Sequence, residues 1–241
     1  MLAACTEPAV TEPVETANKP RLGLMSSLPI LWSGNDAFGA LAKGEAARSH
    51  WSVPALQQDY RIQPLDALSE ESLAAVDVLL LAQPRVLTPQ ENVALDDWVR
   101  DGGQALVLAD PRLVGDYDMP LGDPRRPLDT ALMSPILERW GLQLMQDQAA
   151  ETVRTVAIGE ADMAVAAAGL FRIVPAEGAD CKLALGGLAA QCTIGKGRVA
   201  LLADATLVED PVGGEGSPEA LRVLLGMARD ATRDIVGGSR K

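Results

Sequence analysis

The sequence is poor in the residues on which several kinds of functional site depend. It has one histidine, His50, among 241 residues, and aromatic side chains make up only 3%. A Ser-His-Asp triad, a His-rich zinc site or a haem site would each have to use His50. Surfaces that stack sugars or bases need exposed rings. We therefore expect none of these classes of site.

Positive charge and long apolar runs are also scarce. The chain has 33 acidic and 21 basic residues, which gives a net charge of -12. Binding to a nucleic-acid backbone rests on clustered Lys and Arg, so no nucleic-acid partner is expected. No stretch approaches 18 consecutive apolar residues, so the sequence predicts no membrane-spanning helix. Hydrophobic residues still make up 48%, enough for a folded core.

The three cysteines do not form a C-x-x-C motif, so zinc-ribbon and thioredoxin-like sites are not expected. Cys181 and Cys192 lie symmetrically about Gly186-Gly187, a pair typical of a two-residue hairpin turn. In that register the two cysteines face each other across the strands. The pattern predicts either a disulfide in an oxidising compartment or two buried thiols.

Cys5 ends the segment Leu2-Ala3-Ala4-Cys5, which is similar to a bacterial lipobox. Only four residues precede Cys5, whereas a signal peptide needs a basic segment and a longer apolar one. Either Cys5 is lipidated in a longer precursor or the match is due to chance. Residues 1–20 are predicted to be a tether, because residues 6–20 are rich in Thr, Glu and Pro, and residues 237–241 are predicted to be a frayed tail.

Residues 21–236 are predicted to be one α/β domain, because apolar strands alternate with helices. The clearest signal is Thr88-Pro89-Gln90-Glu91, a capping box that begins a helix ending at Gly102-Gly103. The predicted fold is a doubly wound, mostly parallel sheet with a β-rich excursion over 147–195. Strands are predicted at 21–27, 60–65, 78–82, 105–109 and 197–203. Helices are predicted at 35–41, after 69, at 88–101, after 134 and after 217.

Polar residues follow the predicted strands where ligands meet an open α/β sheet. Gln83, Asp110 and Asp204 each come just after an apolar strand. The remaining candidates at this edge are Ser26, Ser27, Arg85 and Arg112. Together these residues could form a crevice for a carboxylate or an amide. Alternatively, the side chains only cap turns and bind loop carbonyls.

No catalytic residue, metal site or cofactor is assigned from the sequence. Asp110 and Asp204 could in principle act as acid and base or bind a hard cation, but no third partner is visible. The sequence contains neither a G-x-S-x-G nucleophile elbow nor a G-x-x-x-x-G-K-[ST] phosphate loop.

The run from Val78 to Pro111 resembles the GldG-like family, auxiliary components of ABC-type transport systems. It has an apolar strand, a Leu-Thr-Pro-x-Glu helix start, an amphipathic helix ending in Gly-Gly, and a strand ending in Asp-Pro. Residues 21–32 and 195–204 also fit. The resemblance implies a flavodoxin-like fold related to class I glutamine amidotransferases. Catalytic members place a cysteine after the strand equivalent to 105–109, where this chain has Asp110-Pro111, so amidotransferase chemistry is not expected.

These observations predict a non-catalytic, extracytoplasmic binding or scaffolding domain of an ABC-type transport assembly. Its partners would be membrane transport subunits, and a lipid on Cys5 would anchor it in the periplasm. One alternative is a hydrolase or transferase that uses Asp110, Asp204 and Gln83. A second is a cytoplasmic protein that begins at Met1 and binds a small ligand.

Overall fold

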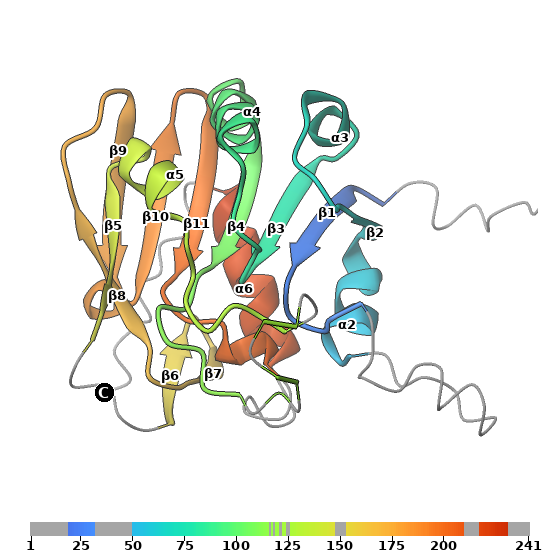
Figure 1. Cartoon of the computed structure of the whole chain (residues 1–241), viewed down its shortest axis with the longest axis vertical. Coiled ribbons are helices and arrows are strands. Elements are labelled where there is room, and N and C mark those ends of the chain that lie inside the picture. Colours follow the sequence, from blue (N-terminus) through green and yellow to red (C-terminus); the bar gives the residue numbers. More distant parts are fainter. Residues whose placement is uncertain are drawn as a thin grey trace, which may run out of the picture.

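A computed structural model of the chain describes residues 19–31, 50–115, 117, 119–120, 122–123, 126–147, 153–209 and 217–230. Most of the predicted tether, the helix predicted at 35–41 and the predicted tail at 237–241 lie outside the described residues. The described part is a mixed α/β protein, as predicted, built on one large sheet (Figure 1).

The large sheet has seven strands in the order β2-β1-β3-β4-β11-β10-β9. The first five strands in this order run parallel, and β10 and β9 continue the sheet in antiparallel fashion. The strands are β1 (Arg21–Ser26), β2 (Arg61–Pro64), β3 (Val78–Ala82), β4 (Gln104–Leu108), β9 (Ala179–Ala184), β10 (Ala189–Ile194) and β11 (Gly197–Leu202). Every residue of β3 is buried, as expected for a strand covered on both faces.

Helices cover both faces of the sheet. On one face, α4 (Pro89–Arg100) lies between α3 (Glu70–Ala74) and α5 (Ser134–Arg139), and α4 contacts both. On the other, α6 (Pro218–Arg229) packs on β4 and β11 and contacts α2 (Ser52–Asp59). Figure 1 shows α6 behind the sheet and α4 in front of it.

The predicted capping box at the start of α4 is present. The Thr88 hydroxyl accepts a hydrogen bond from the Glu91 backbone N–H at 3.2 Å, and the Thr88 N–H donates to the Glu91 carboxylate at 2.8 Å. The short helix α3 begins in the same manner at Ser69, whose hydroxyl accepts from the Ser72 N–H. Helix α2 was not predicted, because Pro54 lies near its start and no side chain caps it.

The β-rich segment after α5 forms three antiparallel pairs of strands. Strand β5 (Leu142–Gln146) pairs with β8 (Gly169–Ile173), and β6 (Arg154–Ile158) pairs with β7 (Ala161–Val165). The third pair, β9 and β10, belongs to the large sheet. Its turn is longer than the predicted two residues. The last paired residues of the two strands are Ala184 and Ala189, so the turn spans residues 185–188. Leu185, the first residue of this turn, adopts a positive φ of 53°.

Candidate functional site

Gln83 ties the ends of β3 and β4 to the loop that follows β4. Its side chain is fully buried, and its Oε1 accepts a hydrogen bond from the Asp110 N–H at 2.8 Å. Its Nε2 donates to the carbonyl oxygens of Asp110 at 3.1 Å and Leu128 at 2.9 Å. The backbone of Gln83 has a φ of 44°, a strained value that these hydrogen bonds hold in place. The amide is thus occupied by backbone groups.

Asp110 joins the ends of β4 and β11. It is fully buried, and its two carboxylate oxygens accept from the N–H groups of Arg112 at 2.7 Å and Ala205 at 3.4 Å. The contact with Arg112, two residues on, is that of an aspartate that caps its own turn. The Asp110 side chain therefore connects two strand ends and has no exposed surface with which to meet a ligand.

Asp204 fastens the β-rich segment to the end of β11. It is also fully buried, and its Oδ1 accepts from the Thr206 N–H at 2.7 Å. Its Oδ2 accepts from the N–H of Ala166, which follows β7, at 3.0 Å. The Asp204 side chain therefore joins the sheet edge to the β-rich excursion. Like Asp110, it lies two residues beyond the last residue of its strand.

A third buried acid, Glu209, lies near this edge and was not among the sequence candidates. Its Oε1 accepts from the Gly115 N–H at 2.6 Å and from the Tyr117 hydroxyl at 2.7 Å. Its Oε2 has no hydrogen-bond partner within the described part of the chain. Tyr117 and Glu209 are 92 positions apart in the sequence, so no local motif indicated this pair.

Burial dominates the electrostatics of the three acids. Loss of solvation raises the pKa of Asp110 to about 7, and the nearby charge of Glu209 adds to the effect. Burial likewise raises the pKa of Asp204 well above its ordinary value, and the nearby charge of Asp110 raises it further. The pKa of Glu209 is raised, again mainly by burial. All three therefore favour the neutral form more than exposed carboxyls do.

The other four candidates do not gather around these acids in a common crevice. The hydroxyl of Ser26 bonds within its own turn, to the backbone of Leu28, and the hydroxyl of Ser27 donates to the Gln83 carbonyl oxygen. Arg112 is exposed at the surface. Arg85 turns toward the start of α4.

Arg85 forms a two-point ion pair with Glu91. Its guanidinium donates to both carboxylate oxygens, at 2.9 and 2.6 Å, and to the Asp66 carbonyl oxygen at 2.6 Å. Glu91 also accepts from the Leu68 N–H at 3.1 Å. The hydrogen bonds from Arg85 are the largest of the effects that lower the pKa of Glu91 to about 2. This network fixes the loops on either side of β3 to α4.

The chemistry available at the sheet edge is limited by this burial. Among the described residues, no group of three or more His, Cys, Asp or Glu side chains could hold a metal ion. Gln83, Asp110 and Asp204 are each 0% exposed. The surface depressions found along α4, beside α5 and at α6 are lined by other residues, none of them a sequence candidate.

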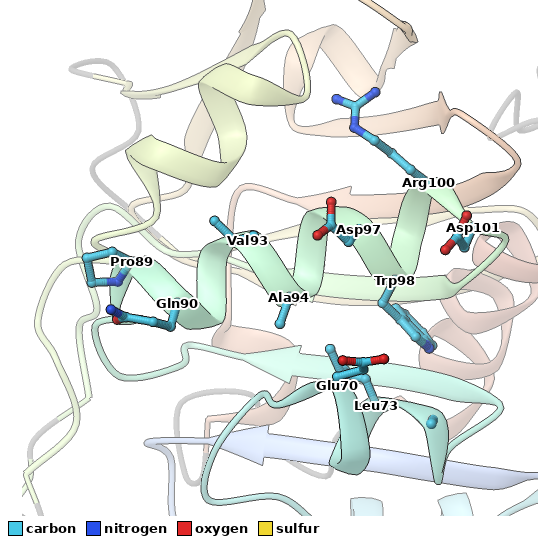
Figure 2. A pocket seen from close by; sticks show the side chains of 11 residues that line it. Glu70, Leu73, Pro89, Gln90, Val93, Ala94, Asp97, Trp98, Arg100 and Asp101 are labelled. Carbon is cyan, nitrogen blue, oxygen red and sulfur yellow. The ribbon is translucent and has the colours of Figure 1, made fainter.

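The largest of these depressions, of ≈ 800 Å³, is a groove between α3 and α4, which we call the α3–α4 groove. Glu70, Leu73 and Ala74 line it from α3. From the other side it is lined by Pro89, Gln90, Val93, Ala94, Asp97, Trp98, Arg100 and Asp101. In Figure 2, Ala94 and Trp98 point toward Leu73 and Glu70. A smaller depression beside α5 shares Pro89 and Val93 with it.

The structure places Cys181 of β9 opposite Cys192 of β10 and joins them in a disulfide. The register is the one that the symmetry about Gly186-Gly187 predicts. Cys192 is buried and Cys181 is partly buried. Cys5 lies outside the described residues.

Fold and site together define a mixed α/β protein with a filled strand edge and an open groove on its helical face. The sequence matches the family of the ABC-type uncharacterized transport system over residues 19–177, and the chain belongs to this family. The resemblance to the GldG-like transport auxiliaries is thereby confirmed. Family membership associates the chain with ABC-type transport.

Solved structures similar to this chain share little sequence with it. One is the cytoplasmic protein STM3548 from Salmonella typhimurium, with 12% identity and a TM-score of 0.48 over 87% of this chain and 97% of that chain. Another is the cytoplasmic protein STM1381 from Salmonella typhimurium LT2, with 12% identity and a TM-score of 0.47 over 89% of this chain and 99% of that chain. A putative ThuA-like protein from Bacteroides uniformis is also similar, with 10% identity and a TM-score of 0.47 over 91% of this chain and 94% of that chain. No curated protein matches the sequence. None of the helices in the described ranges is long and apolar enough to cross a bilayer.

Proposed function

We propose that this chain is a non-catalytic binding or scaffolding domain of an ABC-type transport assembly. The observation that carries the proposal is the filled sheet edge. In open α/β proteins, ligands bind at the carboxyl ends of the strands. Here Gln83, Asp110 and Asp204 occupy that edge and are 0% exposed, and backbone groups take up their polar atoms. The domain then meets its partners through its outer surface.

The rival interpretation, an enzyme that uses Asp110 and Asp204, has one observation in its favour, the raised pKa of both carboxyls. Perturbed pKa values are common in active sites, but structural burial also produces them. A general acid or base must come within hydrogen-bond reach of its substrate. Side chains without accessible surface do not meet this requirement, so burial for a structural purpose is the better explanation.

The proposed fold type is flavodoxin-like. The five parallel strands follow one another along the chain as β1, β2, β3, β4 and β11, and their order in the sheet is β2-β1-β3-β4-β11. This is the 2-1-3-4-5 order of flavodoxin-like sheets. The antiparallel strands β9 and β10 extend the sheet beyond this set.

The proposed location is the periplasm, with an acyl anchor on Cys5. The disulfide between Cys181 and Cys192 supports an oxidising compartment. The Leu-Ala-Ala-Cys segment and the Thr/Glu/Pro-rich residues after it support the anchor. One acyl chain binds membranes only marginally, so a multiply acylated cysteine is required. Palmitate labelling of the full-length protein should mark the wild type and not Cys5→Ala; an unlabelled wild type would refute the anchor.

The transport role is tested by isolating the protein from its native membranes. The chain, carrying an affinity tag, is purified in mild detergent, and the ATPase and membrane subunits of ABC transporters are quantified by mass spectrometry. We expect one such pair of subunits to be enriched at a constant ratio to the chain. A tagged unrelated lipoprotein is the control. Enrichment no greater than in this control would refute the proposed function.

A further inference from the structure

Helix α4 has one face buried in the core and a second face that is only partly covered. Glu91, Leu95 and Val99 are buried beneath the helix. Besides Pro89 and Arg100, the groove is lined from this side by positions 90, 93, 94, 97, 98 and 101, which are spaced three and four apart along α4 and its C-cap. Residues at this spacing share one face of a helix. A second contact face therefore runs the length of α4.

The floor of the groove is apolar. Leu73 is fully buried at its base, Trp98 is partly buried, and Val93 on the α4 ridge is 60% exposed. The small side chains of Ala74 and Ala94 leave room for close approach of another element. Trp side chains that are partly exposed on such a surface are frequent anchors of protein interfaces.

The rim of the groove is acidic. Glu70, Asp97 and Asp101 line it and are exposed. Arg100 and Arg139, the cations near this face, both bind the buried carboxylate of Asp96. Their charge is therefore partly neutralised by another acid, and the rim as a whole favours a basic partner.

We propose that the α3–α4 groove receives an amphipathic helix of a transport-assembly partner, with an apolar face and Lys or Arg along its flanks. This inference rests on the proposed function and specifies where the partner binds. A helix suits the groove because both walls are helices that present residues at i, i+3 and i+4, which pack against the ridges of a third helix. The apolar face covers Val93, Ala94 and Trp98, which keep exposed surface in the groove.

The charge of the chain disfavours the other occupants of such a groove. A second copy carries a net charge of -12 and would bring acid toward acid. An anionic membrane surface would be repelled by Glu70, Asp97 and Asp101 for the same reason. A basic helix gains from the same three carboxylates, and this complementarity fixes the choice of partner.

The charge requirement is tested with two fluorescent 18-residue model helices. Both have the same Leu/Ala face, and one has Lys and the other Glu on its flanks. We expect the Lys helix to bind the wild type by fluorescence anisotropy. The double variant Asp97→Lys/Asp101→Lys should bind it at least tenfold more weakly and should prefer the Glu helix. Asp162→Lys, an exposed position on β7, is the matched control and should bind as the wild type does.

Equal affinity of the Lys helix for the wild type and the double variant would overturn the inference, as would equal affinity of the wild type for both helices. Binding of the wild type to anionic vesicles, or a dimer in ultracentrifugation that the double variant abolishes, would overturn it too. Thermal unfolding of each variant establishes that it is folded before binding is measured.

The native assembly separates this inference from the proposed function. Ala94→Arg places a long cation on the groove floor, and we expect it to reduce co-purification of the transporter subunits at least fivefold, whereas Asp162→Lys leaves it unchanged. If Ala94→Arg retains the subunits as the wild type does, the groove is not the binding surface but the transport role stands. If the wild type itself retains no subunits, the proposed function fails.

Discussion

Replacing Asp110 by Asn should make the protein more stable at pH 8. Asp110 is fully buried, and its pKa is raised from the ordinary 3.8 to about 7, first by loss of solvation. Between pH 3.8 and about pH 7 the folded state therefore binds more protons than the unfolded state. The free energy of unfolding of the wild type therefore falls as the pH rises through this window. The difference in pKa corresponds to about 4 kcal/mol.

An Asn side chain has no charge to bury. It keeps an oxygen to accept the Arg112 N–H and loses the longer contact, 3.4 Å, to the Ala205 N–H. That loss costs about 1 kcal/mol at every pH. Because unfolded Asp110 is already partly ionised at pH 4, we expect Asp110→Asn to be about 0.5 kcal/mol less stable than the wild type at pH 4 and about 3 kcal/mol more stable at pH 8.

The assay is urea unfolding followed by circular dichroism at pH 4, 5, 6, 7 and 8, with exposed Asp162→Asn as the control. Glu91 does not interfere above about pH 5, because its pKa is lowered and it is ionised in both states there. A constant difference between Asp110→Asn and the wild type at all five pH values would refute the argument, because it would show that the Asp110 carboxyl titrates normally.

Two further changes test other parts of the fold. Arg85→Ala removes the partner of Glu91, so it should lower the free energy of unfolding by about 1–2 kcal/mol at pH 7, allowing for the solvent exposure of Arg85. Because the folded pKa of Glu91 is lowered to about 2, this loss should shrink as the pH falls from 4.5 toward 2; a loss that persists at pH 2 would contradict it. Cys181→Ala/Cys192→Ala opens a disulfide with a sequence separation of 11, which should cost about 3 kcal/mol in urea unfolding. The wild type measured with reductant should lose a similar amount, and no loss in either case would show that the bond adds nothing.

The elements with strong local signals were predicted correctly. The capping box before α4 and the apolar runs of β3, β4 and β11 are decided by residues close in the sequence, and tertiary packing agrees with them. Helix α2 shows the opposite case. It has no capping side chain and a weak apolar pattern, and its buried residues depend on packing against α6 and the sheet.

The sheet edge was predicted in position but not in detail. Parallel strands bring their carboxyl ends together, so Gln83, Asp110 and Asp204 could be placed at one edge from the sequence. The sequence does not reveal that the loop carbonyl of Leu128 and the N–H of Ala166 turn these side chains inward. Those contacts come from segments 38 to 45 positions away, beyond the reach of any local pattern.

The α3–α4 groove was missed for a related reason. The sequence shows the stripe of Leu95, Trp98 and Val99 on α4, which a packed helix explains. Whether the adjoining stripe through Val93 and Ala94 is covered depends on how far α3 reaches along α4. Helix α3 has only five residues, and this leaves the stripe open.

The central claim is that this domain acts through its outer helical face and not through its strand edge. The most direct test compares two variants in one experiment, co-purification of the transporter subunits from native membranes. We predict that Asp110→Asn/Asp204→Asn retains the subunits at the wild-type ratio and that Ala94→Arg loses them. Retention by Ala94→Arg together with loss by a folded Asp110→Asn/Asp204→Asn would contradict the account.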